Sequence, residues 1–169
     1  MRTHAIAAAI PLAFAICAFP ALADDLIMFR GGIGVIPVST VATNADGTFA
    51  NVNRNVVRGV NPPGQIWVIE ELRAEVHADG RIRVDGRGLL LGGGNGIGTN
   101  AGQSVRATLI CEAVAPFTLL NTGLVPLEAN GDFRIDDSLN PALPAECASP
   151  VLLIRNPGGA WFAAGIVKR

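Results

Sequence analysis

The chain has 169 residues and a formal net charge of −1, with 13 lysines and arginines against 14 aspartates and glutamates. This balance leaves no basic excess to neutralise phosphates, so nucleic acid is not an expected partner. The length is that of one domain large enough to bury a hydrophobic core.

The first 23 residues have the organisation of a secretory signal peptide. Arg2 precedes an apolar run at 5–19, and the small residues of Ala-Leu-Ala at 21–23 suit cleavage by signal peptidase. An uncleaved membrane anchor is the alternative, but the run is shorter than the roughly 18 residues that cross a bilayer. We therefore expect one exported domain over 24–169, secreted or periplasmic, with no membrane span once the signal peptide is removed.

Most of the remaining chain alternates between short strand-like segments and turns. The opening segment, 24–34, is expected to be a loose arm or an edge strand. Apolar content and period-2 alternation predict further strands, apart from the hairpins described next. These strands are 33–42, 65–76, 104–114, 117–120, 151–155 and 161–167. Trp67 and Trp161 lie within two of them, and we expect both in the core.

Residues 72–86 alternate apolar and polar side chains on both sides of Ala-Asp-Gly at 78–80, which predicts a β-hairpin. The apolar faces coincide only with a three-residue loop, because a two-residue turn would place Val76 opposite Arg83. Such a loop ends in a left-handed residue, and Gly80 suits that position because it lacks a Cβ. The predicted cross-strand pairs are Val76–Ile82, Ala74–Val84, Glu75–Arg83 and Arg73–Asp85.

The same Ala-Asx-Gly sequence recurs at 129–131 and at 45–47. The loop rule applied to 129–131 again joins apolar residues, and the predicted pairs there are Leu127–Phe133 and Val125–Ile135. At 45–47 the same rule would pair Thr43 with Phe49 and Val41 with Asn51, and we expect the turn there but not the whole ladder. We interpret the polar residues Arg83, Asp85, Arg134 and Asp136 as a solvated sheet face with cross-strand charge pairs.

Two connections are longer than the others: a glycine-rich loop at 92–103 and a proline-rich loop at 136–150. Once the signal peptide is removed, Cys111 and Cys147 are the remaining cysteines. An even pair in an exported protein predicts one disulfide, with two free buried thiols as the alternative. The bridge would close a loop of about 37 residues and contribute about 4 kcal/mol on the chain-entropy model.

About nine to ten short strands with frequent turns predict an all-β fold. An antiparallel β-sandwich with immunoglobulin-like or Greek-key connections is the expected architecture, and a small β-barrel is the alternative.

Residues that would carry catalysis do not form a recognisable set. His77 is the single histidine after the signal peptide, and none of the serines at 39, 104, 138 and 149 lies in a Gly-x-Ser-x-Gly sequence. Neighbouring carboxylates, at 70–71 and at 136–137, would point to opposite faces of a strand. The glycine-rich loop has Thr99 where a phosphate-binding loop needs a third glycine. We therefore assign no catalytic residues and no cofactor.

Metal sites are not predicted either. One histidine and two bridged cysteines are too few for zinc or copper. Calcium would need oxygen ligands at loop spacing, and the oxygen-bearing residues near the second turn lack the EF-hand order. Those residues are Asn130, Asp132, Asp136, Asp137 and Asn140, and turn capping is the simpler interpretation.

The leading hypothesis is a non-catalytic binding or structural module of the cell envelope or extracellular space. Its partner would be a protein or a surface ligand, and the sequence assigns no binding residues. One alternative is an enzyme of unrecognised type, with a site where the loops at 92–103 and 136–150 converge at one end of the sandwich. Another is a self-assembling subunit that uses an exposed edge strand at 161–167.

Overall fold

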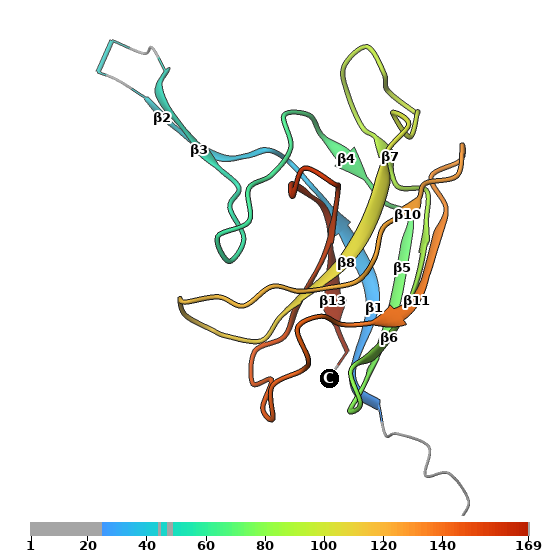
Figure 1. Ribbon diagram of the computed structural model, residues 1–169. Coiled ribbons are helices and arrows are strands. Elements are labelled where there is room, and N and C mark those ends of the chain that lie inside the picture. The colour runs from blue at the N-terminus through green and yellow to red at the C-terminus, as the bar shows by residue number, and fades with distance from the viewer. Residues whose placement is uncertain (1–24, 44, 47–48, 169) are drawn as a thin grey trace, which may run out of the picture.

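The computed structural model describes residues 25–43, 45–46 and 49–168, in which strands are joined by turns and loops (Figure 1). The predicted signal peptide lies outside these residues. The strands are β1 (Asp25–Gly34), β2 (Val38–Thr43), β3 (Phe49–Arg54), β4 (Trp67–Val68), β5 (Glu71–His77), β6 (Arg81–Arg87), β7 (Leu90–Leu91), β8 (Ser104–Ile110), β9 (Leu120–Asn121), β10 (Val125–Pro126), β11 (Phe133–Ser138), β12 (Val151–Arg155) and β13 (Trp161–Val167).

The main sheet has the order β10-β8-β12-β13-β1-β5-β6-β11, and β9 also pairs with β8. Every pairing in it is antiparallel, which confirms the predicted all-β antiparallel class. Two small sheets, β2-β3 and β4-β7, accompany it.

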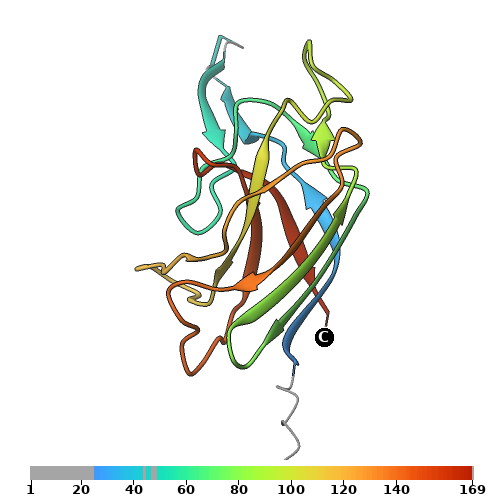
Figure 2. The same cartoon turned by 45° about the vertical axis from the view of Figure 1, so that its right-hand side comes forward.

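The main sheet curls into a nearly closed barrel, which was the alternative architecture expected from the sequence (Figure 2). Asn121 of β9 forms a β-bridge with Asn140, which follows β11. The amide N–H of Gly123 donates to the Asp137 carboxylate at 2.7 Å. Because β9 pairs with β8 and β11 ends the other side of the sheet, these contacts bring the two ends of the sheet together. Both halves of the sheet contribute side chains to one enclosed core.

The β5–β6 hairpin has the predicted register. The strands end at His77 and resume at Arg81, and Gly80 has the left-handed φ of 85°. The four predicted cross-strand pairs are all present. The apolar set lies inside the barrel, where Val76, Ile82 and Val84 are buried, and the polar set lies outside. Local alternation and turn length therefore determine this register together.

The second hairpin prediction is correct for the turn and wrong for the strands. Gly131 has a φ of 83°, and its amide donates to the carbonyl of Glu128. Beyond the turn the two arms separate: Val125 pairs with Val105 of β8, whereas Ile135 pairs with Val84 of β6. The arms part because β8 and β6 offer longer-range partners that also place apolar residues toward the core.

The repeated sequences pair with each other across β6 and β11. Arg83 faces Asp136 and Asp85 faces Arg134, with N–O distances of 3.1 and 3.7 Å. An Arg-apolar-Asp sequence paired antiparallel with a copy of itself matches each arginine with an aspartate and each apolar residue with another. This self-complementarity explains the repetition better than two separate hairpins do.

Reversing one of these charges, Arg83→Asp, is expected to lower the free energy of unfolding by about 0.5 kcal/mol, because it places like charges opposite each other on an exposed surface. The double reversal, Arg83→Asp with Asp136→Arg, should recover most of the loss. Urea unfolding of both single variants and the double variant measures the coupling. A double variant whose loss equals the sum of the single losses would show that the pair does not interact.

The first copy of the turn sequence lies in the β2–β3 hairpin, which projects away from the barrel (Figures 1 and 2). Thr43 pairs with Phe49 as the loop rule gives, but Val41 pairs with Val52 and not with Asn51, because the register shifts beside Thr43. Part of the predicted turn, including residue 47, lies outside the described residues. The shift places Val41 opposite another valine.

Several predicted strand limits need correction. Segments 33–42 and 65–76 each join parts of two strands, with breaks at 35–37 and 69–70, and 104–114 ends four residues early at 110. Segment 117–120 becomes β9 at 120–121, whereas 151–155 and 161–167 have the predicted limits.

Two expectations about sheet edges are also wrong. β1 is an interior strand between β13 and β5, not an arm or an edge. β13 lies between β12 and β1, so it has no free edge to offer. An interior strand and an edge strand can carry the same alternation of side chains, so period-2 counting alone does not distinguish them. The predicted core positions of Trp67 and Trp161 are confirmed, and Trp67 stacks on Phe162 at 3.9 Å between ring centroids.

Candidate functional site

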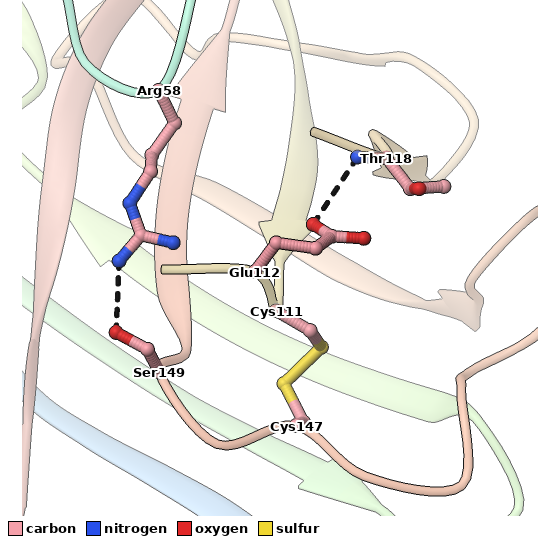
Figure 3. The surroundings of a disulfide bond; sticks show 6 residues. All are labelled: Arg58, Cys111, Glu112, Thr118, Cys147 and Ser149. Carbon is pink, nitrogen blue, oxygen red and sulfur yellow. Dashed lines mark hydrogen bonds between the residues drawn. A yellow bond between two sulfur atoms is a disulfide. The ribbon is translucent and has the colours of Figure 1, made fainter. Parts of the chain in front are cut away.

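Loops cover part of the outer surface of β8 and β12, and a disulfide fixes one of them (Figure 3). Cys111 directly follows β8 and bonds to Cys147 in the loop that precedes β12, as the sequence predicts. The amide of Ser149 also donates to the carbonyl of Cys111 at 3.2 Å. The covered face is buried, since Thr108 and Leu153 have no exposed surface.

Arg58 connects its own turn to the loops that carry Ser149 and Phe117. It lies in the turn closed by the Val57–Val60 bridge, and its own φ is 48°, which is uncommon for a side-chain-bearing residue. One terminal nitrogen of its guanidinium donates to Ser149 Oγ at 2.8 Å. The guanidinium carbon lies 5.7 Å from the centre of the Phe117 ring, a cation–π contact.

The loop that carries Phe117 is held by Glu112. The amide of Thr118 donates to this carboxylate at 3.1 Å (Figure 3). That hydrogen bond and other backbone donors stabilise the charged form and lower the pKa of Glu112. Phe117 is therefore positioned independently of Arg58.

A hollow of about 450 Å³, which we call the Arg58–Arg155 hollow, opens beside these contacts. Its walls come from the Arg58 turn, the Phe117 loop, the end of β12 and the turn before β13. The residues that line it are Arg58, Gly59, Val60, Asn61, Phe117, Leu119, Arg155, Gly158, Gly159 and Ala160. The volume is in the range of small-ligand pockets.

Arg155 ends β12 and contributes the second positive charge. Its Nε donates to the carbonyl of Gly159 at 2.9 Å, and its Nη1 lies 3.4 Å from Asn121 Oδ1. Arg106 is its direct cross-strand neighbour on β8. Burial, and then the charge of Arg106, lower the pKa of Arg155, because both disfavour its charged form.

In the part of the chain that the structure describes, Arg58, Arg106 and Arg155 form no ion pair. Arg58 Nη1 and Arg106 Nε are also buried without a hydrogen-bond partner there. Arginine side chains are seldom fully buried unless they are paired, and burial makes an unpaired guanidinium costly. These three arginines therefore carry positive charge that no ion pair among the described residues neutralises.

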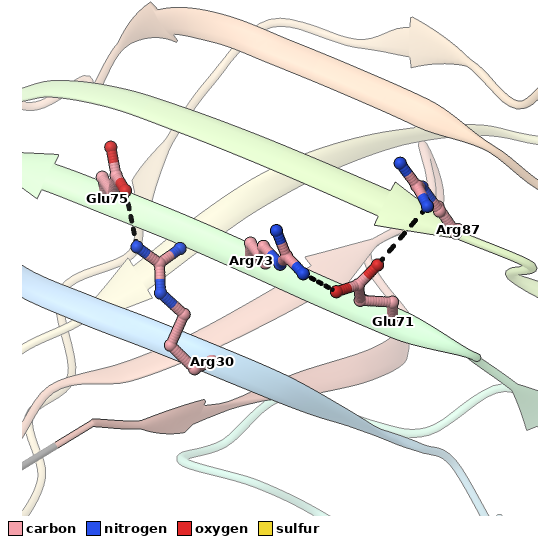
Figure 4. Close-up of polar contacts among 5 residues, drawn as sticks. All are labelled: Arg30, Glu71, Arg73, Glu75 and Arg87. Carbon is pink, nitrogen blue, oxygen red and sulfur yellow. Dashed lines mark hydrogen bonds and ion pairs between the residues drawn. The ribbon is translucent and has the colours of Figure 1, made fainter.

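The opposite pattern holds on the outer face of β1, β5 and β6 (Figure 4). Arg30 pairs with Glu75 at 2.8 Å, and Glu71 pairs with both Arg73 and Arg87. A hollow of about 400 Å³ lies over this sheet, and both signs of charge line it. These mutually satisfied charges fit the solvated face that the sequence predicts.

The sequence candidates for catalysis lie apart or have structural partners. His77 ends β5 beside the hairpin turn, whereas Ser149 lies in the disulfide loop. Asp136 pairs with Arg83, and Asp137 accepts hydrogen bonds from backbone amides, so these neighbouring carboxylates have separate roles.

Two of the calcium candidates, Asn130 and Asp132, cap a turn. The side chains of Asn130 and Asp132 hydrogen-bond to each other at 3.0 Å, and Asp132 also accepts from the amide of Gly88. Among the described residues, no three His, Cys, Asp or Glu side chains gather as metal ligands.

The two long loops do not converge. The 92–103 loop packs against β4 and β7. The Gly92 amide donates to the Ile66 carbonyl, and the Gly98 amide donates to the Leu91 carbonyl. The loop after β11 contacts the other end of the barrel, where Leu139 donates to Gly80 (Figures 1 and 2). The expected meeting of these loops in a shared site is therefore wrong.

Sequence reasoning missed the Arg58–Arg155 hollow because four segments far apart in the chain contribute to it. The only local signal is Arg155 after four apolar residues, which reads as the end of a strand. Comparison with known proteins found no matching family model, no matching curated protein and no matching solved structure. Within the described residues there is no helix with the length and apolar character of a membrane span.

Proposed function

We propose that this chain is an exported, non-catalytic binding protein that holds an anionic group of its ligand in the Arg58–Arg155 hollow. The observation that carries the proposal is the pair of half-buried arginines that face one hollow with no carboxylate partner among the described residues. A carboxylate is the simplest complement, since guanidinium groups bind carboxylates through charge-assisted hydrogen bonds.

The surroundings of the two arginines support a binding role. Backbone contacts and the disulfide loop fix the positions of both guanidinium groups before any ligand arrives. Such preorganisation lowers the entropy cost of binding. Glycines at 59, 158 and 159 leave room in the walls, and Phe117 and Leu119 supply apolar surface for the uncharged part of a ligand.

Export is part of the proposal. The disulfide supports an oxidising compartment, and the first 23 residues have the pattern of a signal peptide. We place the protein in the periplasm or outside the cell. Intact mass of the protein recovered from each fraction of its native host tests this: a chain that begins at Asp24, with no reactive thiol, is the expected result.

The binding proposal is tested with galacturonate against neutral galactose, which lacks the carboxylate. We expect galacturonate to bind and galactose not to bind, measured by isothermal titration calorimetry. Arg58→Gln should weaken galacturonate binding by about tenfold or more, because a charge-assisted hydrogen bond is lost. Arg83→Gln is the matched control, since Arg83 is paired with Asp136 on another surface, and it should leave the affinity unchanged. Equal binding of the two sugars would refute the anion site.

Self-assembly remains a second candidate on a different structural basis. Among the described residues, β2 and β3 pair only with each other, and the hairpin projects from the barrel (Figure 1). An isolated two-stranded hairpin is marginally stable in water, so addition to another chain would stabilise it. Light scattering at increasing protein concentration tests this; a particle that stays monomeric removes the candidate.

A further inference from the structure

A second hollow of about 470 Å³ is lined by Arg106, the direct cross-strand partner of Arg155. Arg106 supplies its positive charge, and its Nε is buried without a partner in the described residues. Asn121, Ser138 and Asn140 supply amide and hydroxyl groups to its walls, and Asp137 adds one carboxylate. It is therefore a polar hollow with a cation at one side.

Arg155 and Asn121 connect the two hollows. Arg155 lines the first hollow, Asn121 lines the second, and Arg155 Nη1 lies 3.4 Å from Asn121 Oδ1. Arg155 and Arg106 are direct partners across β12 and β8, so their Cα atoms are separated by about 5 Å, as in any antiparallel pair. Arg155 therefore lies between Arg58, with which it lines the first hollow, and Arg106, its neighbour across the two strands.

We propose that the two hollows together bind a stretch of acidic polysaccharide, with consecutive charged sugar units in consecutive hollows. This inference rests on the proposed function and adds the class of ligand. Repeated positive charges along one surface favour a ligand with repeated negative charges over a single small anion. A polymer of uronate units provides one carboxylate for each hollow and hydroxyl groups for the amide and hydroxyl groups between them.

The composition of the walls favours a sugar polymer over a nucleic acid. Proteins that bind single-stranded nucleic acid use exposed aromatic rings on which bases stack. Among the described residues that line the two hollows, Phe117 is the single aromatic one, and the Arg58 guanidinium occupies its face. Asn121, Ser138, Asn140 and Asp137 supply groups to the second hollow that can exchange hydrogen bonds with sugar hydroxyls.

The experiment compares tetragalacturonate with galacturonate on protein purified from its native host. Tetragalacturonate is expected to bind at least tenfold more tightly, because it occupies both hollows. Arg106→Gln should weaken tetragalacturonate by about tenfold and leave galacturonate unchanged, since Arg106 lines only the second hollow. Arg106→Lys retains the charge and should recover part of the loss. Arg134→Gln, from the paired outer face, is the control, and thermal unfolding confirms that each variant is folded.

The outcomes separate the two proposals. If galacturonate binds normally and Arg106→Gln has no effect on the binding of tetragalacturonate, the extended site is wrong and the anion site stands. If neither sugar binds the wild-type protein, both proposals are wrong. A single-stranded oligothymidylate that binds as tightly as tetragalacturonate, with the same loss in Arg106→Gln, shows that the ligand class is wrong.

Discussion

Replacing both Cys111 and Cys147 with alanine is expected to lower the free energy of unfolding by about 4 kcal/mol, because the bridge closes a long loop. The two cysteines are 36 positions apart, so the unfolded chain gains much freedom when the link is removed. Cys111 is also buried, and its loss removes packing beside β8. Urea unfolding of the wild-type and double-alanine proteins measures the difference, and wild-type protein in reductant should approach the variant.

The same change is expected to weaken ligand binding as well as stability. Ser149 lies two residues after Cys147 and accepts a hydrogen bond from Arg58, so the disulfide loop holds the guanidinium in place. Ser149→Ala removes this contact without removing the bridge, which makes it the matched control. It should weaken galacturonate binding with a stability loss of about 1 kcal/mol. A double-alanine variant with unchanged stability and affinity would show that the bridge supports neither the loop nor the hollow.

The sequence predicts strand pairing well where neighbouring residues determine it, and poorly where distant strands compete for the same partner. The β5–β6 register follows from a three-residue turn and the alternation beside it, and both are visible in 15 residues. The arms around 129–131 have the same local pattern, yet they separate, because β10 joins β8 and β11 joins β6. Both arrangements pair apolar residues with apolar residues, so alternation alone does not choose between them.

The Arg58–Arg155 hollow is harder to predict from the sequence than the strands are. Arg58, Phe117 and Arg155 are brought together by the barrel and by the disulfide, across almost 100 positions of sequence. The cysteine pair is predictable because even cysteines in an exported chain imply a bridge. An unpaired arginine is not, since the absence of a carboxylate partner is a property of the folded neighbourhood.

Gly86 on β6 is expected to tolerate no side chain, because it faces Phe133 of β11 inside the barrel. The two residues are direct cross-strand partners, and a Cβ on Gly86 would overlap the Phe133 ring. The ring therefore occupies the space that a side chain at 86 would need. Gly86→Val should lower the free energy of unfolding by about 3 kcal/mol through overpacking. Gly64→Val is the control: a Cβ there meets nothing within 4 Å, so the loss should be about 0.5 kcal/mol or less.

A double-mutant cycle shows whether the ring is the cause. Phe133 is 5% exposed, so Phe133→Ala alone should cost about 3 kcal/mol or more through the cavity that it leaves. In the double variant, Gly86→Val with Phe133→Ala, the valine occupies part of that cavity and no longer meets the ring. The combined loss should then be at least 1 kcal/mol smaller than the sum of the single losses. Additive losses in urea unfolding would mean that position 86 does not contact the Phe133 ring. The pairing of β6 with β11, and with it the self-complementary pairing of the repeated sequences, would then be wrong.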